Sequence, residues 1–395
     1  MVHLPQRLRN YLLALMPAFP PVYAVFALAG LFKLPALPRR LKAFLLLVAG
    51  LQFLAALATP QPLVSLALAA ARMVLIYGLM GMGLLLASAR PFVYLLAGLS
   101  LVYISALVVS LHTYGYMLFD RTRLIHPYYN SVSLGLAAAL GLLIIAVQSR
   151  RLPWALSLVV GSLAAVVLLL SGSRGALVAL LAGSAAAALL DQGLRRRLFG
   201  ILGSTLAAVI LLGRWIHIFP VNRLLNWTYL SNRDVVWKGA LDTFLSHVWG
   251  GVGPYQLGLY LHIKHVRGCH LSILKYIWGP GCRDGLGVFD VARVAAHNTL
   301  LHSLAETGVI GTAGWLLLYG LIGYAVWRAR DPLIAAIFFG FMAMGFVDNP
   351  TLVPSYSLAE TFWIAAGVAL AKAGLGAAPA EPRVAASKAS RPPPT

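Results

Sequence analysis

One imidazole is notable for its position in the chain. His297 is followed by Asn298, a run of nine residues and then Gly308-x-x-Gly311, where a long polar segment gives way to an apolar one. Histidine exchanges a proton near neutral pH, so His297 could act there as a base towards a hydroxyl group. The alternative is structural: Asn298 caps a helix and the histidine is an interfacial polar residue.

Two arginines could bind a phosphate. Arg174 follows Ser171-Gly172-Ser173 in a short turn between two apolar stretches, and Arg233 begins a stretch with helical spacing. A guanidinium offers a planar fork to phosphate oxygens, and helix starts favour anions. The alternatives are a membrane-edge anchor for Arg174 and an exposed ion pair with Asp234 for Arg233.

A further loop carries Arg121, Arg123 and His126. These residues form either a second basic contact or, with Tyr128 and Tyr129, a belt at the level of the lipid headgroups.

Neither a metal nor a cofactor is expected. The sequence has no Walker A loop and no Asp-x-Asp pair. His262, His265, Cys269 and His270 do not give four well-spaced ligands, which favours an interfacial polar stretch. Cys269 and Cys282 are either a disulfide, if their segment faces an oxidising compartment, or two free thiols.

The elements that position these residues are membrane helices. Of the 395 residues, 60% are hydrophobic and only 11% are charged, against about 25% charged in soluble proteins. We therefore expect an all-α polytopic membrane protein. Eleven apolar stretches can span, since about 20 residues cross a bilayer: about 11–32, 42–59, 63–88, 91–112, 129–148, 153–171, 174–190, 198–213, 308–328, 332–347 and 355–373.

Residues 11–32 contain Pro17, Pro20 and Pro21 and have basic residues on both flanks, which favours a broken hairpin and twelve crossings. Basic clusters, among them Arg39-Arg40, Arg150-Arg151 and Arg195 to Arg197, place their connections in the cytoplasm. His297, Arg174 and Arg233 then lie on the outer face.

The predicted organisation has four parts: N-terminal transmembrane helices (1–213), a large outer loop domain (214–307), C-terminal transmembrane helices (308–373) and a disordered cytoplasmic tail (374–395). The outer loop should be partly helical, with a helix over 235–248. Residues 214–296 hold nine Lys or Arg and four Asp or Glu. Basic charge on the translocated side indicates an anionic partner, whereas nucleic acid is not expected because no soluble basic face exists.

Together these residues resemble the O-antigen ligase and polymerase superfamily. The motifs that carry the resemblance are His297-Asn298 with Gly308 and Gly311, Ser171-Gly172-Ser173-Arg174-Gly175, Arg233 with Trp237 and Gly251-x-Gly253, and His126-Pro127-Tyr128-Tyr129.

The resemblance implies a metal-independent, C-type glycosyltransferase in the bacterial inner membrane, with its active site facing the periplasm. Its donor would be a glycan on undecaprenyl pyrophosphate. His297 would be the base, and Arg174 and Arg233 would bind the pyrophosphate. Arg121, Arg123, His126, Asn298 and Tyr128 are secondary candidates.

The single dominant loop favours a ligase that transfers O-antigen to a lipid A–core sugar. A polymerase and a protein O-oligosaccharyltransferase are the enzymatic alternatives, and a lipid or polysaccharide transporter is the non-enzymatic one. The oligomeric state is left open.

Overall fold

The protein is an all-α membrane protein, as predicted. The computed structural model describes residues 6–87, 91–120, 122–211, 218–225, 233–261, 295–352 and 358–376. In chain order the helices of the first half are α1 (Gln6–Ala18), α2 (Val22–Leu31), η1 (Leu34–Ala36), α3 (Arg39–Leu57), α4 (Pro62–Leu86), α5 (Pro91–Tyr114), α6 (Met117–Asp120), α7 (Ser131–Gln148), η2 (Ser149–Arg151), α8 (Trp154–Ser171) and α9 (Arg174–Leu190). They are followed by α10 (Gln192–Leu211), α11 (Phe219–Leu225), α12 (Arg233–Ser246), α13 (Leu257–Tyr260), α16 (Thr299–Ala329), α17 (Pro332–Met344) and α18 (Ala359–Lys372).

Within these residues, six helices are long and apolar enough to cross a membrane: α3, α4, α5, α7 (counted with η2), α8 and α16. Three shorter apolar segments accompany them, at Val22–Ala36, Arg174–Leu190 and Pro332–Met344. The first predicted span is a pair of helices, α1 and α2, so the expected broken hairpin is confirmed. The total of eleven or twelve crossings remains a prediction.

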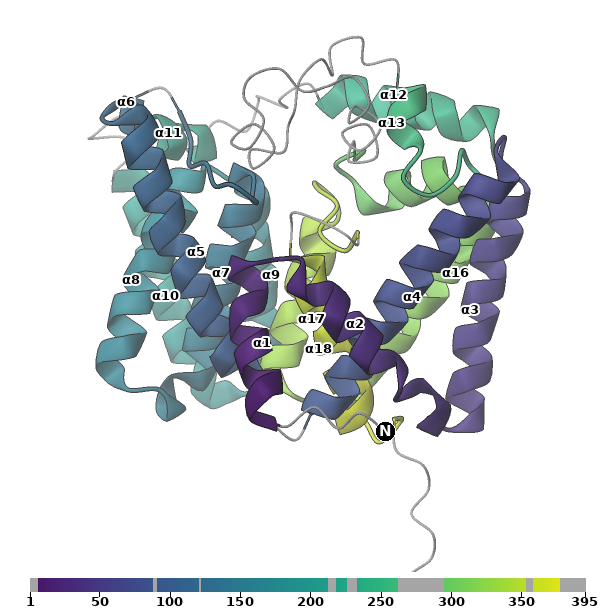
Figure 1. Ribbon diagram of the computed structural model, residues 1–395. Coiled ribbons are helices and arrows are strands. Elements are labelled where there is room, and N and C mark those ends of the chain that lie inside the picture. The colour runs from purple at the N-terminus through teal and green to yellow at the C-terminus, as the bar shows by residue number, and fades with distance from the viewer. Residues whose placement is uncertain are drawn as a thin grey trace, which may run out of the picture.

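The helices form two groups that meet along the middle of the molecule. Figure 1 shows α3, α4 and α16 on one side, α5 with α7 to α10 on the other, and α17 and α18 between them. The most extensive packing joins α17 to α9, α2 to α4 and α18 to α4. The core therefore connects helices that lie far apart in the sequence.

Small residues allow the closest of these approaches. A Cβ added to Gly30 of α2 would lie 1.8 Å from the Gly78 carbonyl oxygen of α4, and one added to Gly83 would lie 2.1 Å from the Ile364 oxygen of α18. Because lipid tails are as apolar as the helices, membrane helices associate through such tight contacts.

Polar side chains define where several helices begin. Asn130, Ser173, Asn298 and Asp331 each accept a backbone N–H of the following first turn, at α7, α9, α16 and α17. Such caps satisfy donors that a helix start leaves unpaired. Three of these helices, α7, α9 and α16, thereby start at the end of the molecule that also carries α11, α12 and α13, uppermost in Figure 1.

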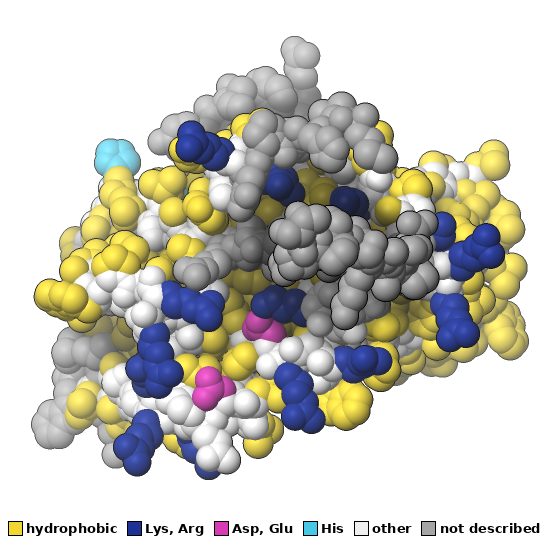
Figure 2. All heavy atoms as spheres, turned by 90° about the horizontal axis from the view of Figure 1, so that it is seen from below, with side chains coloured by type: hydrophobic (Ala, Val, Ile, Leu, Met, Phe, Trp, Pro, Cys, Tyr) yellow, Lys and Arg dark blue, Asp and Glu magenta, His cyan; other side chains and the backbone are white. Residues whose placement is uncertain are grey.

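The two ends of the molecule differ in character. The start of α3, η2, the start of α10 and the end of α16 carry basic residues at the lower end, and Figure 2 shows Lys and Arg side chains spread over that face. This is the arrangement that the positive-inside rule favours for a cytoplasmic face. The upper end therefore corresponds to the predicted outer face.

The outer segment is partly helical where it is described, as predicted. Residues 218–225 and 233–261 contain α11, α12 and α13, and the helix predicted over 235–248 is present as α12. Residues 248–253 pack against α16, where Val252 donates its N–H to the Ala305 carbonyl (3.0 Å) and Val309 donates to Val248 (2.8 Å).

The contact is centred on Gly308, whose backbone (φ 58°, ψ −166°) kinks α16. A Cβ on this residue would lie 2.3 Å from the Trp249 carbonyl carbon. The glycine is therefore required both by its positive φ and by the close approach of a second backbone.

Candidate functional site

The site is built around a pair formed by His297 and Asp348. The imidazole Nδ1 lies 3.1 Å from Asp348 Oδ1, across 51 residues of sequence. His297 sits just before α16 with φ 50°, while Asn298 caps the helix by accepting the Leu301 N–H at 2.9 Å. The His297 side chain is 41% exposed and that of Asp348 is 10% exposed. The pair thus presents one imidazole edge to the outer face and has a buried carboxylate behind it.

Hydrogen bonds from Asn298 and Thr299 to the turn after α17 hold the two residues together. Thr299 donates its N–H to the Gly345 carbonyl (2.7 Å), and its hydroxyl donates to the Asp348 carbonyl (3.3 Å). The Asn298 amide donates to the Phe346 carbonyl at 3.1 Å. The start of α16 is therefore joined to the turn that follows α17.

The electrostatics of this turn keep Asp348 ionised. Burial alone would raise the pKa of its carboxyl, but the bond from His297, the Asn349 N–H (2.8 Å) and the Arg233 charge lower it below the ordinary value. An ionised carboxylate only accepts hydrogen bonds. It follows that His297 Nδ1 donates to Asp348 and leaves Nε2 as the basic nitrogen.

The second Asp348 oxygen faces an arginine. Arg233 Nη2, at the first residue of α12, lies 3.8 Å from Asp348 Oδ2. One carboxylate therefore contacts both the predicted base and a predicted phosphate-binding guanidinium. This places a proton acceptor and a cationic group on neighbouring positions of the same outer surface.

Arg233 belongs to a larger arginine cluster, which comprises Arg123, Arg174, Arg223 and Arg233. Burial, followed by the charges of Arg223, Arg233 and Arg174, lowers the pKa of Arg123 to about 10. The cations come from four elements: the 122–130 loop, α9, α11 and α12. Mutual repulsion among them creates a region suited to a multiply charged anion.

The turn before α9 fixes two of these arginines. Arg123 Nε donates to the Ser171 carbonyl at 2.6 Å, and Ser173 caps α9 so that Arg174 becomes its first residue. Gly172 has φ +58°, and a Cβ there would lie 2.9 Å from the Pro220 carbonyl oxygen. A second backbone therefore approaches closely at Gly172, and this contact brings α11 with Arg223 to the turn.

The secondary candidates have different environments. His126 is 6% exposed, its Nε2 lies 2.9 Å from Ser105 Oγ, and its Nδ1 accepts the Tyr128 N–H. Burial lowers the pKa of His126 to about 4, so at neutral pH it is uncharged and does not extend the basic surface. Its ring lies beside those of Tyr128 and Tyr129, and these contacts help shape the loop that carries Arg123.

Some sequence predictions fall outside the described residues. These are Arg121, the disulfide candidates Cys269 and Cys282, and the polar stretch His262 to His270.

A buried ionic cluster lies one turn below the surface pair. Arg72 Nη2 of α4 contacts Glu306 Oε2 of α16 at 2.5 Å, and His302 Nε2 lies 3.3 Å from the same oxygen. The Tyr255 N–H donates to Glu306 Oε1 at 2.7 Å, and the Arg72 guanidinium lies 4.2 Å from the centre of the Tyr255 ring. The cluster ties the kinked part of α16 to α4 and to the outer segment.

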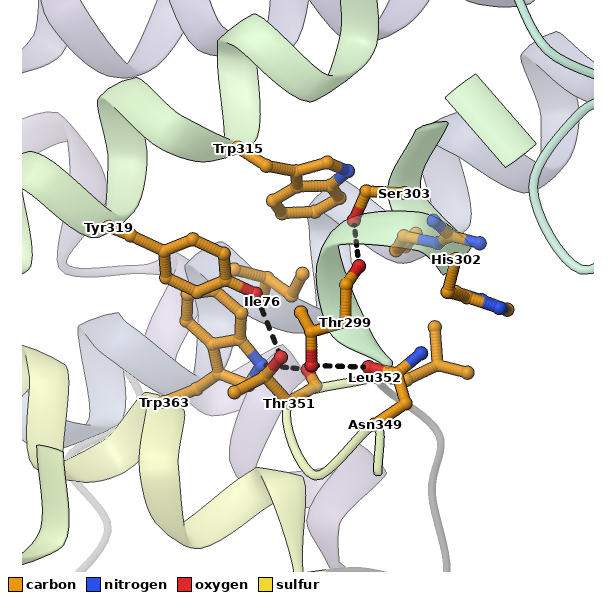
Figure 3. Close-up of a pocket in the computed structure, with 11 residues that line it drawn as sticks. Ile76, Thr299, His302, Ser303, Trp315, Tyr319, Asn349, Thr351, Leu352 and Trp363 are labelled. Carbon is orange, nitrogen blue, oxygen red and sulfur yellow. Dashed lines mark hydrogen bonds between the residues drawn. The ribbon is translucent and has the colours of Figure 1, made fainter. Parts of the chain in front are cut away.

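Arg72 and His302 of this cluster also line a small cavity of ≈ 20 Å³, enough for about one water molecule. Figure 3 shows Thr299, His302, Ser303 and Asn349 on one part of its wall and the rings of Trp315, Tyr319 and Trp363 on another. The cavity is too small for a sugar.

Two site residues are missing from the sequence predictions. They are Asp348 and Arg223. The available signals were an acidic residue in the Asp348-Asn349-Pro350 turn after an apolar stretch and one further arginine among the nine Lys or Arg of residues 214–296.

The fold and site define a polytopic membrane protein with an imidazole–carboxylate pair beside clustered arginines at one end of the helix bundle. Residues 159–316 match the family model Wzy_C, described as O-antigen ligase. The match identifies this part of the chain with the O-antigen ligase superfamily and confirms the resemblance predicted from the sequence. The matched region contains Arg174, Arg223, Arg233 and His297. No match was found among curated proteins.

The match supports a glycosyltransferase-like function of the O-antigen ligase and polymerase class.

Proposed function

We propose that the protein is an O-antigen ligase. It transfers a glycan from undecaprenyl pyrophosphate to a sugar hydroxyl of lipid A–core, on the periplasmic face of the bacterial inner membrane. The observation that carries the proposal is the His297–Asp348 pair beside the arginine cluster, linked through the second oxygen of Asp348. A base and an anion-binding surface are the two requirements of such a transfer.

His297 is the general base. Its Nδ1–H is held by the Asp348 carboxylate, so Nε2 faces outward and takes the proton of the acceptor hydroxyl. The acceptor oxygen attacks the anomeric carbon as the bond from that carbon to the pyrophosphate oxygen breaks. One displacement inverts the anomeric centre, and base catalysis of this type contributes about 10²–10⁴-fold.

The arginines bind the pyrophosphate and stabilise its charge as it leaves. Arg174 and Arg233 are the principal contacts in the proposal, with Arg123 and Arg223 in support. Charge-assisted hydrogen bonds from guanidinium groups strengthen as negative charge develops on the leaving oxygen. The proposal is metal-independent, because these cations take the role that a divalent metal has in other glycosyltransferases.

A polymerase or a protein O-oligosaccharyltransferase would use the same base and the same arginines with another acceptor. A transporter would place ionisable side chains along a pathway inside the bundle. Arg72, inside α4, is instead paired with Glu306 and its side chain is only 4% exposed. The buried pair supports a structural role for Arg72 and favours surface chemistry over transport.

The test is transfer by purified, reconstituted protein supplied with undecaprenyl-pyrophosphate glycan. Three acceptors are compared: lipid A–core, a second lipid-linked glycan and an acceptor protein. We expect product with lipid A–core alone, with and without EDTA. Product with the lipid-linked glycan alone would indicate a polymerase, and product with the acceptor protein alone would indicate a protein O-oligosaccharyltransferase. Activity that is lost with EDTA and restored by Mg²⁺ would contradict a metal-independent reaction.

A further inference from the structure

A cavity of ≈ 280 Å³ opens on the face opposite the His297 site. It lies where α5 and α17 begin and where α7 and α18 end, next to the α9–α10 junction. The six polar side chains that line it are Gln148, Arg150, Arg151, Asp191, Asp331 and Lys372. Figure 2 shows this face, on which Lys and Arg side chains are spread and few Asp or Glu side chains are visible.

The acidic residues of the cavity are engaged in local structure. Asp331 Oδ1 caps α17 by accepting the N–H groups of Leu333 (2.9 Å) and Ile334 (3.1 Å), and its Oδ2 binds the Lys372 ammonium. Asp191 Oδ1 accepts the Gly193 N–H at 2.8 Å. These carboxylates stabilise helix starts and pair with one lysine, and the three cationic and two anionic side chains leave the cavity with a net charge of +1.

Arg150 and Arg151 supply the cationic wall. Both lie in η2 at the end of α7, and neither guanidinium has a hydrogen bond or ion pair to another described residue. Each guanidinium can offer a planar fork of donors to phosphate oxygens.

Gln148 contributes a hydrogen-bond acceptor that has no donor among the described residues. Its side-chain oxygen is buried and receives no hydrogen bond from the described part of the chain. A buried acceptor without a donor costs free energy. A ligand that carries a hydroxyl or ammonium group next to its phosphate would satisfy it.

We infer that this cavity binds the phosphodiester headgroup of an inner-leaflet glycerophospholipid. The phosphate contacts Arg150 and Arg151, and the headgroup hydroxyl or ammonium donates to the Gln148 oxygen. Basic pockets between transmembrane helices on the cytoplasmic side commonly hold such headgroups. The inference does not depend on the proposed transferase activity.

A headgroup in this place would join helices that carry the site at their other ends. α9 begins with Arg174 on the outer face, and the turn after α17 carries Asp348. The lipid would brace the cytoplasmic ends of α7, α17 and α18 against one another. Its role is therefore stabilisation of the bundle.

The experiment is native mass spectrometry of the full chain released from detergent containing phosphatidylglycerol or phosphatidylethanolamine. The double variant R150Q/R151Q is compared with R195Q/R196Q, which removes the same charge from the same face outside the cavity. A third variant, Gln148→Leu, leaves all charges in place. Soluble glycerol phosphate is added to the unchanged protein as a competitor.

We expect R150Q/R151Q to weaken phospholipid retention by about 10- to 30-fold, since each basic residue near the surface contributes on the order of 1 kcal/mol, and to lower the melting temperature gained on adding lipid. Gln148→Leu should weaken retention too, and R195Q/R196Q should not. Equal loss in both arginine pairs would overturn the inference, because it would show general surface attraction.

Two further outcomes are decisive. Displacement of phospholipid by soluble glycerol phosphate, a phosphate monoester, would support phosphate recognition at Arg150 and Arg151 but would overturn the assignment to a lipid headgroup. If R150Q/R151Q does not fold, unchanged lipid retention by Gln148→Leu, together with no effect of glycerol phosphate on the unchanged protein, would overturn the proposal. The experiment does not measure glycan transfer, so failure of the proposed transferase function would leave these results unaffected.

Discussion

His297 and Asp348 form a hydrogen-bonded pair, with 3.1 Å between the imidazole Nδ1 and the carboxylate Oδ1. The pair joins the start of α16 to the turn after α17. It assigns the proton of the neutral imidazole to Nδ1, and it positions a basic nitrogen at the outer surface. The same carboxylate lies 3.8 Å from Arg233. Asp348 therefore contacts both the proposed base and one arginine of the proposed anion-binding surface.

Replacing Asp348 with Asn should reduce kcat for glycan transfer by on the order of 10²-fold or more, because the amide no longer fixes the imidazole tautomer. KM for the lipid-linked donor should change little. Steady-state kinetics measure both. Asp234→Asn, an exposed acid beside Arg233, is the matched control and should behave like the unchanged protein. Equal losses in the two variants would remove Asp348 from the mechanism.

Replacing Arg233 with Gln should mainly weaken binding of the lipid-linked donor. Loss of a charge-assisted hydrogen bond to phosphate removes about 1.5–3 kcal/mol, so KM for the lipid pyrophosphate should rise by about 10- to 100-fold. Lys238→Gln removes an exposed charge from the same helix and should leave KM unchanged. A donor KM that does not respond to Arg233→Gln would contradict its role in binding.

Gly308→Ala should prevent the outer segment from docking on α16. The residue has φ 58°, and an added Cβ would lie 2.3 Å from the Trp249 carbonyl carbon, so the backbone must move. Gly320→Ala in the same helix meets no atom within 4 Å and should be neutral or stabilising by up to about 1 kcal/mol. Thermal unfolding in detergent compares the two. Similar melting temperatures would show that the contact at Gly308 is dispensable.

Stability should fall in mild acid because of His126. Its pKa is lowered to about 4 in the folded protein, against about 6.5 when unfolded. The unfolded chain therefore binds the proton more readily, and the stability present above pH 6.5 is lost progressively as pH falls towards 4. This difference in pKa corresponds to a contribution of roughly 3 kcal/mol to the free energy of unfolding. Chemical unfolding at several pH values measures it, and His126→Gln should flatten this dependence. Parallel curves for the two proteins would refute the assignment.

Hydropathy predicts most of the bundle because each lipid-facing helix must be apolar along its length. The predicted stretch 174–190 coincides with α9, and 153–171 nearly coincides with α8. The predicted span 308–328 begins nine residues after α16 starts, and Asn298 caps that start, as the structural interpretation of the sequence expected. Residues 299–307 mix polar and apolar side chains, so hydropathy leaves them out of the span. They pack on residues 248–253 and on Arg72, through contacts that no local pattern reveals.

The candidate site was predictable only in part. The spacing around His297 and the turn before Arg174 are local signals, so both residues could be chosen from the sequence. Asp348 and Arg223 reach the site through the packing of α17 and α11, and one acid or one arginine in a loop has no distinctive spacing. His126 is the opposite case. The sequence made it a candidate because it lies in a basic loop, but the structure shows that it is buried and neutral.

The central claim is that His297 takes the proton of the acceptor hydroxyl. The most direct measurement is single-turnover transfer from undecaprenyl-pyrophosphate glycan to lipid A–core by His297→Ala, combined with donor binding to the same preparation. We predict a rate lower by about 10²–10⁴-fold with donor affinity close to that of the unchanged protein. Transfer at the unchanged rate by a variant that still binds donor would contradict the account.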